Sequence, residues 1–310
     1  MVVTDAWPGD GPVLLDGGLA TELERRGHDL TDGLWSARLL RDDPGAVSDV
    51  HLAFFRAGAQ VATSASYQAS FEGFAAHGLP HEESEGLMRD SVRLAREAAD
   101  VAESEDGVRR VVAASVGPYG AVRADGSEYH GDYGVTDGFL RDAHGPRMEV
   151  LATSGADLLA IETIPSEQEA TVLLGLLDEM PPGTRAWLSL TCGDATWTRR
   201  GEDVSRVFGL ARGMERVVAV GANCTAPRHM DDLVGAAVAA SGKPAIAYPN
   251  SGETWDAVSR EWRGDGAGVD PASAQRWVAS GARLVGGCCR VGVTDIERLS
   301  AGGVPRSAGG

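Results

Sequence analysis

The sequence predicts an α/β fold, a single (β/α)8 barrel domain spanning residues 1–310. Short apolar, β-rich runs alternate with amphipathic stretches, a pattern typical of parallel βαβ units. Eight such runs occur, and eight units in about 300 residues match this barrel in number and in size. The alternative α/β architecture, an open doubly wound sheet, would place a G-x-G-x-x-G motif after the first strand, and the sequence has none there.

Each expected strand is a run rich in aliphatic and β-branched residues. In chain order the runs cover residues 13–16, 60–64, 110–116, 158–162, 185–190, 216–221, 245–248 and 283–287. The carboxyl ends of barrel strands open onto one face, where the active sites of this fold lie. Reactive side chains at the ends of these runs are therefore the first candidates for function.

A long helix is expected over residues 82–105. Its apolar side chains recur at intervals of four, three, four and three, which places them on one helical face: Met88, Val92, Ala95, Ala99 and Ala102.

Three later helices carry start signals. Ser166 and Glu169 match a capping box, in which each side chain bonds the other residue's backbone N–H, before the apolar run 172–177. Pro227 and Pro271 stand where helices should begin, because proline suits the first helical position.

Two connections exceed ordinary loop length, residues 117–136 and 250–269. Both follow strands, so they are either solvated insertions or loops that build a site. The last ten residues, 301–310, are expected to form a loose tail.

The charge balance narrows the class of partners. The formal net charge is −17, which argues against nucleic-acid binding, since that needs a basic footprint, and against binding to an anionic membrane surface. No apolar run approaches about 18 residues, so no membrane span is expected. The first ten residues lack the basic start and apolar core of a secretory signal, and we expect a cytoplasmic protein with reduced thiols.

Three of the four cysteines end barrel strands. Cys224 follows the sixth strand, and Cys288 and Cys289 follow the eighth. Alternate strands lie close together around a barrel, so these thiols should converge. Three protein ligands with one open position is the pattern of catalytic zinc, which thiolates favour among the common divalent ions. The chain must bend for adjacent cysteines to reach one metal, and Gly286 and Gly287 allow this.

Other interpretations of the cysteines stay open. Cys192 is read as a small buried hydrophobe. Cys288 and Cys289 could instead act as a redox pair, in a zinc or thiol sensing module.

Two carboxylates also lie at strand ends. Asp16 ends the first expected strand, and Glu162 ends the fourth. Each could accept charge-assisted hydrogen bonds from an ammonium group. Asp16 could instead be a turn residue, and Glu162 could instead be a solvated strand end. Gly17 and Gly18 could bring backbone N–H groups to a ligand carboxylate, or simply form a tight turn.

Taken together, the motifs resemble the homocysteine S-methyltransferase family over nearly the whole chain. They are LLDGGLATELERRG, LWSARLL, SYQASFEGF, SVGPYGA, ADGSEYHGDY, IETIP, NCTAP, YPNSGE and GGCCR. The resemblance implies one zinc ion per chain held by Cys224, Cys288 and Cys289. It also implies that Asp16 and Glu162 hold the amino group of the substrate.

The same resemblance implies the reaction. A methyl group would pass from a sulfonium donor, S-methylmethionine or S-adenosylmethionine, to the thiol of L-homocysteine, giving methionine. A different acceptor, another thiol or a selenol, stays open, as does the choice of donor. Both partners would be small molecules.

A sulfonium ion is attracted to aromatic faces, which makes loop aromatics candidates for donor contact. Tyr67, in SYQAS after the second strand, is singled out, and Asn250 in YPNSGE is a second candidate for contact with donor or substrate. Further aromatic candidates, which are more often packing residues, lie in the two long loops: Tyr119, Tyr129, Tyr133 and Trp255.

Overall fold

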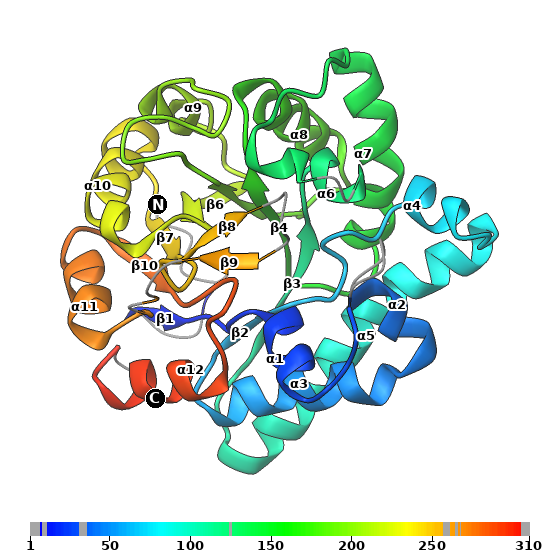
Figure 1. Cartoon of the computed structure of the whole chain (residues 1–310), viewed down its shortest axis with the longest axis horizontal. Coiled ribbons are helices and arrows are strands. Elements are labelled where there is room, and N and C mark those ends of the chain that lie inside the picture. Colours follow the sequence, from blue (N-terminus) through cyan, green and yellow to red (C-terminus); the bar gives the residue numbers. More distant parts are fainter. Residues whose placement is uncertain are drawn as a thin grey trace.

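A closed barrel of eight parallel strands forms the centre of the computed structural model, which describes residues 7, 11–30, 36–123, 126–256, 261–263, 266 and 268–304. Neighbouring strands follow the order β1-β10-β7-β6-β5-β4-β3-β2. A parallel bridge between Leu15 and Val61 joins the two ends of this order, and Asp16 N–H donates to Val61 O at 3.0 Å. Figure 1 looks along the barrel, with the strands inside a ring of helices.

All eight expected strands are present, which confirms the predicted (β/α)8 barrel. They are β1 (Val13–Leu14), β2 (Val61–Thr63), β3 (Val111–Val116), β4 (Leu158–Ile164), β5 (Ala186–Leu190), β6 (Val217–Asn223), β7 (Ala245–Tyr248) and β10 (Ala282–Val285). Most ends differ from expectation by one or two residues. β4 and β6 run two residues further than predicted, so that Thr163 and Asn223 lie within strands.

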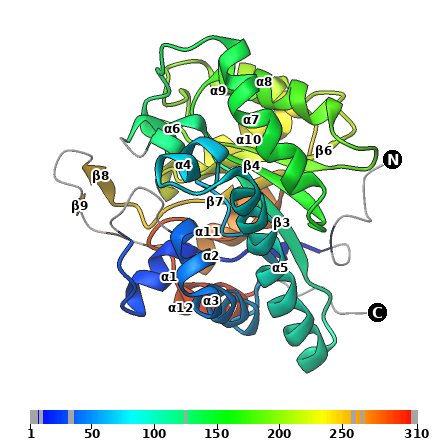
Figure 2. The ribbon, with the colours of Figure 1, turned by 90° about the vertical axis from the view of Figure 1, so that its right-hand side faces the viewer.

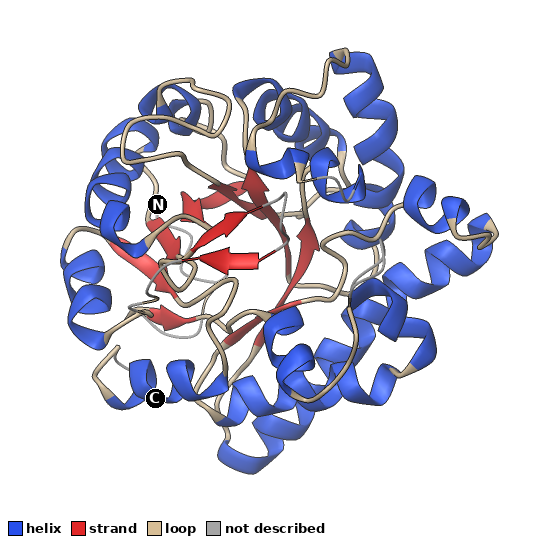
Figure 3. Ribbon diagram, viewed as in Figure 1, coloured by secondary structure: helices blue, strands red, loops and turns tan. Residues whose placement is uncertain are grey.

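Helices surround this sheet (Figure 3). They are α1 (Leu19–Arg25), α2 (Ser36–Asp42), α3 (Pro44–Arg56), α4 (Phe71–Ala76), α5 (His81–Asp106), α6 (Tyr119–Arg123), α7 (Asp137–Ala152), α8 (Glu167–Glu179), α9 (Val204–Gly209), α10 (Met230–Ser241), α11 (Pro271–Ala279) and α12 (Val293–Ala301), with short 3-10 turns η2 (Ser127–Tyr129) and η3 (Pro227–His229).

The helix expected over 82–105 is confirmed as α5. Its five predicted face residues are buried, and Gly107 ends it in the left-handed conformation, with φ 71°, where a residue without Cβ fits best. Pro227 begins η3 directly before α10, and Pro271 begins α11, as predicted.

The core has two layers, as expected when a sheet closes on itself inside helices. Side chains that point into the barrel form one cluster, which includes Leu15, Trp187 and Ile246. Side chains that point outward pack against the helices and form the larger cluster. The barrel interior is therefore filled, and only its end is available for a site.

Both long connections contain regular structure rather than open loop. Residues 117–136 include α6 and η2. Residues 250–269 include an antiparallel hairpin of β8 (Thr254–Asp256) and β9 (Glu261–Arg263), which projects beyond one end of the barrel in Figure 2.

The capping box predicted at Ser166 forms only in part. Ser166 Oγ accepts the Glu169 N–H at 3.2 Å, so the serine caps α8. The Glu169 carboxylate instead accepts hydrogen bonds from Tyr119 N–H at 2.6 Å, from the Tyr133 hydroxyl at 3.1 Å and from His144 Nε2 at 2.8 Å. Glu169 is fully buried, and burial lowers the pKa of His144. Partners from α6, from α7 and from the loop before α7 outcompete the local backbone for this carboxylate.

The packed part of the chain extends beyond residue 301, where a loose tail was expected to start. Ala301 ends α12, and Val304 is buried at 2% exposure. The remainder of the expected tail, residues 305–310, lies outside the described residues.

Candidate active site

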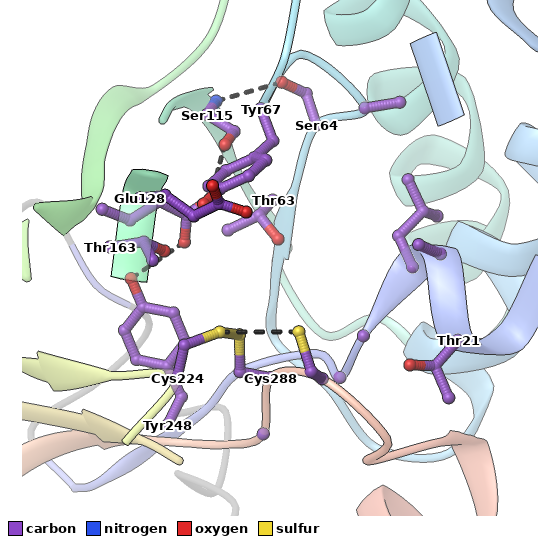
Figure 4. A pocket seen from close by; sticks show the side chains of 18 of the residues that line it. Thr21, Thr63, Ser64, Tyr67, Ser115, Glu128, Thr163, Cys224, Tyr248 and Cys288 are labelled. Carbon is purple, nitrogen blue, oxygen red and sulfur yellow. Dashed lines mark hydrogen bonds between the residues drawn. A yellow bond between two sulfur atoms is a disulfide. The ribbon is translucent and has the colours of Figure 1, made fainter. Parts of the chain in front are cut away.

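A cavity opens at the carboxyl ends of the strands, the face where the active sites of this fold lie. Its wall includes the first turn of α1, the ends of β2, β3, β4, β6 and β7, and the segment after β10. Figure 4 shows the cavity from close by, with sulfur atoms on one side and Tyr67 and Glu128 on the other.

The structure brings the three predicted cysteine ligands together. The Sγ atoms of Cys224, Cys288 and Cys289 all lie within 4.8 Å of one another, and Cys289 Sγ is 3.6 Å from Cys224 Sγ. Cys192 is buried at 1% exposure and apart from this group, as predicted.

One expectation about these thiols is wrong in this structure. All were expected to be reduced, but Cys224 and Cys288 are joined by a disulfide, whereas Cys289 is free. The alternative redox pair, Cys288 with Cys289, does not form. The closeness that three ligands of one metal require also allows two thiols to bond, and the pair must be reduced before both can bind a metal, because thiolate is the ligand.

The backbone around the cysteines is unusual. Cys288 and Cys289 follow the end of β10 and lie outside any strand, so side-chain alternation does not separate them. A Cβ on Gly286 would lie 2.5 Å from Leu15 Cβ, and one on Gly287 would lie 2.1 Å from Val291 Cγ1. These glycines therefore bring the chain against Leu15, directly after β1, and against Val291, in the loop that leads to α12. Cys224 has φ 45°, which is rare for a residue with a side chain.

Asn223 links the sulfur group to the neighbouring strand. Its Oδ1 accepts the Thr163 N–H and the Ser189 hydroxyl, both at 2.8 Å. Its Nδ2 donates to Thr163 Oγ1 at 2.7 Å and lies 3.8 Å from Cys288 Sγ. Because a backbone N–H can only donate, the orientation of the amide is determined and an N–H faces the sulfur.

Glu162 is buried and lines the cavity. Its carboxylate accepts hydrogen bonds from Ser115 Oγ and, at 2.9 Å, from the Tyr248 hydroxyl. Burial raises the pKa of Glu162, although both hydrogen bonds oppose that shift. Trp187 Nε1 donates to the Tyr248 hydroxyl at 3.1 Å, which holds that tyrosine in place.

Asp16 lies next to the cavity, and its predicted contact with the substrate amino group stays a prediction. Its carboxylate accepts the Thr63 N–H at 2.8 Å and faces the Thr63 hydroxyl. Thr63 and Gly17 line the cavity, whereas Asp16 is not among the lining residues. Burial raises the pKa of Asp16 well above its ordinary value, and the negative charge of Glu162 adds to the shift. A cation between the two carboxylates would relieve both effects.

Gly17 and Gly18 both line the cavity. A Cβ on Gly17 would lie 2.4 Å from Val291 O, and one on Gly18 would lie 2.7 Å from Cys288 O, so close packing requires both glycines. The Gly18 N–H donates to Val291 O at 2.8 Å, which takes it away from the predicted contact with a ligand carboxylate.

The candidate aromatic residues separate into two groups. Tyr67 and Tyr129 line the cavity. Tyr119 and Tyr133 do not, because both contact Glu169 and pack edge to face with each other. The side chain of Trp255 lies outside the described residues.

Asn250 supports the site instead of lining it. Its N–H donates to Thr225 O at 3.2 Å, and its Nδ2 lies 3.5 Å from Cys224 O. These contacts place Asn250 beside the cysteine group, and its predicted contact with donor or substrate stays a prediction.

Several lining residues were not predicted, namely Thr63, Ser115, Glu128, Thr163 and Tyr248. Ser115, Thr163 and Tyr248 lie at or next to strand ends and could have been found from that position. Glu128 lies in η2 and gave no comparable signal.

The chain matches a known family over almost its whole length. The family model of homocysteine S-methyltransferase matches residues 13–302. The chain belongs to the homocysteine S-methyltransferase family. A relative from Zea mays, homocysteine S-methyltransferase 4, is 45% identical over 303 residues, covering 94% of this chain and 89% of its own length. Selenocysteine Se-methyltransferase of Brassica oleracea var. italica is 43% identical and covers 93% of this chain and 88% of its own.

Solved structures of the family agree with this assignment. The homocysteine methyltransferase MmuM of Escherichia coli, in its metallated form, is 42% identical with a TM-score of 0.85, covering 94% of this chain and 96% of its own. The oxidized form of the same protein gives the same TM-score and identity. Among the described residues of this homocysteine S-methyltransferase family member, no helix is long and apolar enough to cross a membrane.

Proposed function

We propose that this chain transfers a methyl group from a sulfonium donor to the thiol of L-homocysteine, giving methionine. The observation that carries the proposal is the convergence of three cysteine sulfurs within 4.8 Å, in a cavity that also contains the buried carboxylate of Glu162. Membership of the homocysteine S-methyltransferase family supports the same activity and argues against a sensing module.

The residues present fit one zinc ion. Zinc–sulfur bonds of about 2.3 Å in a tetrahedron place the sulfurs roughly 3.8 Å apart, close to the 3.6 Å between Cys224 and Cys289. After reduction, Cys224, Cys288 and Cys289 would hold the metal and leave one position open. When bound, zinc lowers the pKa of a coordinating thiol so that it is a thiolate at neutral pH. Because this requires reduced thiols, we also propose a cytoplasmic location.

The reaction needs no general acid. A lone pair of the homocysteine thiolate forms the new carbon–sulfur bond, while the pair of the breaking bond stays on the donor sulfur, which leaves as a neutral thioether. No proton has to be supplied to that group. The protein therefore contributes position and charge, and holding two reactants at near-attack distance can lower the barrier by about 7–11 kcal/mol.

Glu162 and Asp16 would orient the acceptor. Their carboxylates are buried, and a positive amino group beside Glu162 would compensate its negative charge. Asp16 would act beside Thr63, a lining residue whose N–H it accepts. The amino group would then direct the thiol toward the cysteine side of the cavity.

A second acceptor class is supported by two of the relatives, which are named as selenocysteine methyltransferases. Selenocysteine Se-methyltransferase is 43% identical to this chain over 304 residues, so we propose that a selenol could replace the thiol. The selenolate would use the same lone-pair displacement.

The proposal is tested by one assay with reduced protein. Homocysteine is offered with S-methylmethionine, S-adenosylmethionine, betaine and methyl-folate in turn, with and without a chelator. We expect methionine from the sulfonium donors only, and a loss of turnover when the metal is removed. Methionine formation with betaine alone would contradict the proposed donor class, and full turnover after metal removal would contradict the metal site.

A further inference from the structure

The wall of the cavity opposite the sulfurs carries a second carboxylate, Glu128 (Figure 4). Glu128 is 5% exposed, yet it lines the cavity together with Tyr67 and Tyr129. Burial raises the pKa of both tyrosine hydroxyls, and the nearby negative charge of Glu128 adds to that shift, after Cys289 in the case of Tyr129.

The cavity wall carries negative side chains without a positive one. Its described residues include the carboxylates of Glu128 and Glu162, and none of them is Lys, Arg or His. Such a wall favours cationic ligands. The amino group of the acceptor satisfies Glu162, and a second positive charge fits the side of Glu128.

The surroundings of Glu128 suit a cation that has no hydrogen to donate. An ammonium ion needs several acceptors in a defined arrangement, whereas an alkylated cation is attracted to aromatic faces and to a nearby negative charge. Tyr67 and Tyr129 supply aromatic rings in the cavity wall, and Glu128 supplies the charge. We propose that these three residues bind the positive sulfur of the methyl donor, with Glu128 as its counter-ion. This inference rests on the proposed function and assigns the donor side of the same cavity.

The segment that carries Glu128 is held firmly. Glu169 anchors it at both ends, through Tyr119 N–H at 2.6 Å and the Tyr133 hydroxyl at 3.1 Å. A Cβ on Gly120 would lie 2.3 Å from the Glu128 nitrogen, so α6 and η2 pack without a gap. The counter-ion is thus fixed before the donor arrives, and binding does not have to order it.

Tyr129 is braced in a similar way. The Arg199 guanidinium carbon lies 5.7 Å from the centre of its ring, and Arg199 is not among the residues that line the cavity. One contact of the ring is therefore supplied by the protein, while its cavity side stays available to the donor.

A counter-ion in this position has a distinct kinetic effect. The thiolate and the sulfonium lose their charges as the carbon–sulfur bond forms and the donor bond breaks. Glu128 therefore stabilises the bound donor more than the transition state, and an interaction of this kind lowers KM without raising kcat.

Glu128→Gln tests this assignment, with Glu149→Gln as the matched control, because Glu149 is exposed on α7 and its loss changes the net charge equally. The dissociation constants of S-methylmethionine and of methionine, its uncharged-sulfur analogue, are measured on the reduced, zinc-loaded protein without acceptor, followed by donor KM and kcat. We expect Glu128→Gln to weaken S-methylmethionine about tenfold and methionine less than twofold, with kcat undiminished and Glu149→Gln like wild type. Melting temperature and zinc content establish that the variant is folded.

Three results would overturn the proposal. They are unchanged S-methylmethionine binding, an equal loss for methionine, and a fall in kcat at constant donor KM. Glu128→Asp keeps the charge and should retain most of the preference for S-methylmethionine over methionine. A Glu128→Asp protein that has lost this preference to the same extent as Glu128→Gln would also contradict the proposal. The binding comparison needs no turnover, so a wild-type protein that binds the sulfonium through Glu128 without forming methionine would refute the proposed function alone.

Discussion

Asn223 holds Thr163 through both ends of its side-chain amide, accepting the threonine N–H at 2.8 Å and donating to the threonine hydroxyl at 2.7 Å. Thr163 has φ 61°, a conformation that a β-branched residue adopts rarely and at a cost of roughly 1–3 kcal/mol. The same amide nitrogen faces Cys288 Sγ. Asn223 therefore holds the strained Thr163 in the cavity wall and at the same time contacts Cys288, a proposed metal ligand.

Asn223→Asp should disturb the strained threonine and the cysteine together. The substitution keeps the shape but removes both donors and adds a negative charge beside the thiols. We expect a loss of about 2 kcal/mol in the free energy of unfolding and weaker zinc binding, measured by denaturant unfolding and by competition with a chelator. Ser189→Ala is the control, because it removes one donor to Asn223 Oδ1 and leaves the amide nitrogen in place. Zinc affinity equal to wild type in Asn223→Asp would count against the role of this amide.

Glu162→Gln should separate acceptor binding from donor binding. The amide keeps contacts to Ser115 and Tyr248 but cannot neutralise an ammonium group. We expect homocysteine KM to rise about tenfold to hundredfold, with a smaller change in donor KM, in initial-rate assays that vary one substrate at a time. Equal changes in both KM values would place Glu162 outside the acceptor subsite.

Glu169→Ala should destabilise the segment that carries Glu128 and Tyr129. The change leaves Tyr119 N–H, the Tyr133 hydroxyl and His144 without the carboxylate that they share. Since unsatisfied buried polar groups are costly, we expect a loss of about 2–4 kcal/mol in the free energy of unfolding. The exposed Glu149→Ala variant should stay within about 0.5 kcal/mol of wild type in the same urea titration. A Glu169→Ala protein as stable as that control would show that the anchor is dispensable.

His51 predicts an acid-sensitive component of stability. Its ring is fully buried in α3, and neither ring nitrogen has a hydrogen-bond partner in the described part of the chain. Burial lowers its pKa to about 4, whereas the unfolded chain takes up this proton near pH 6.5. Acid therefore favours the unfolded state. This contribution is intact above about pH 6.5 and is lost as the pH falls toward 4, by up to about 3 kcal/mol.

His51→Leu should remove this component. Unfolding free energies of the variant and of wild type are compared at pH 7.5 and pH 5.5, with exposed His130→Gln as the control. We expect wild type and the control to lose about 1 kcal/mol more than His51→Leu between these two values. Parallel losses in all three proteins would mean that His51 does not titrate as its burial implies.

Much of the fold follows from local pattern. The eight strands were predicted because buried parallel strands give short continuous apolar runs, and the cysteine group followed because barrel strands end on one face. The capping box at Ser166 was predicted only in part, because local spacing cannot reveal that Tyr119, Tyr133 and His144 compete for Glu169.

The details of the site depend on contacts between distant segments. Asp16 faces Thr63, 47 residues away, and Asn250 lies behind Cys224, 26 residues away. The left-handed conformation of Thr163 has no signature in its own side chain, since it depends on Asn223. Glu128 was missed because it lies in η2, between two strands, whereas the predicted site residues were sought at strand ends.

The zinc content of reduced protein, measured together with methionine formation for wild type and Cys224→Ser, tests whether the three cysteines share one metal ion. Three thiolates that share one cation predict about one zinc per wild-type chain and the joint loss of zinc and turnover in Cys224→Ser. A Cys224→Ser protein that forms methionine at the wild-type rate with no bound metal would contradict the account.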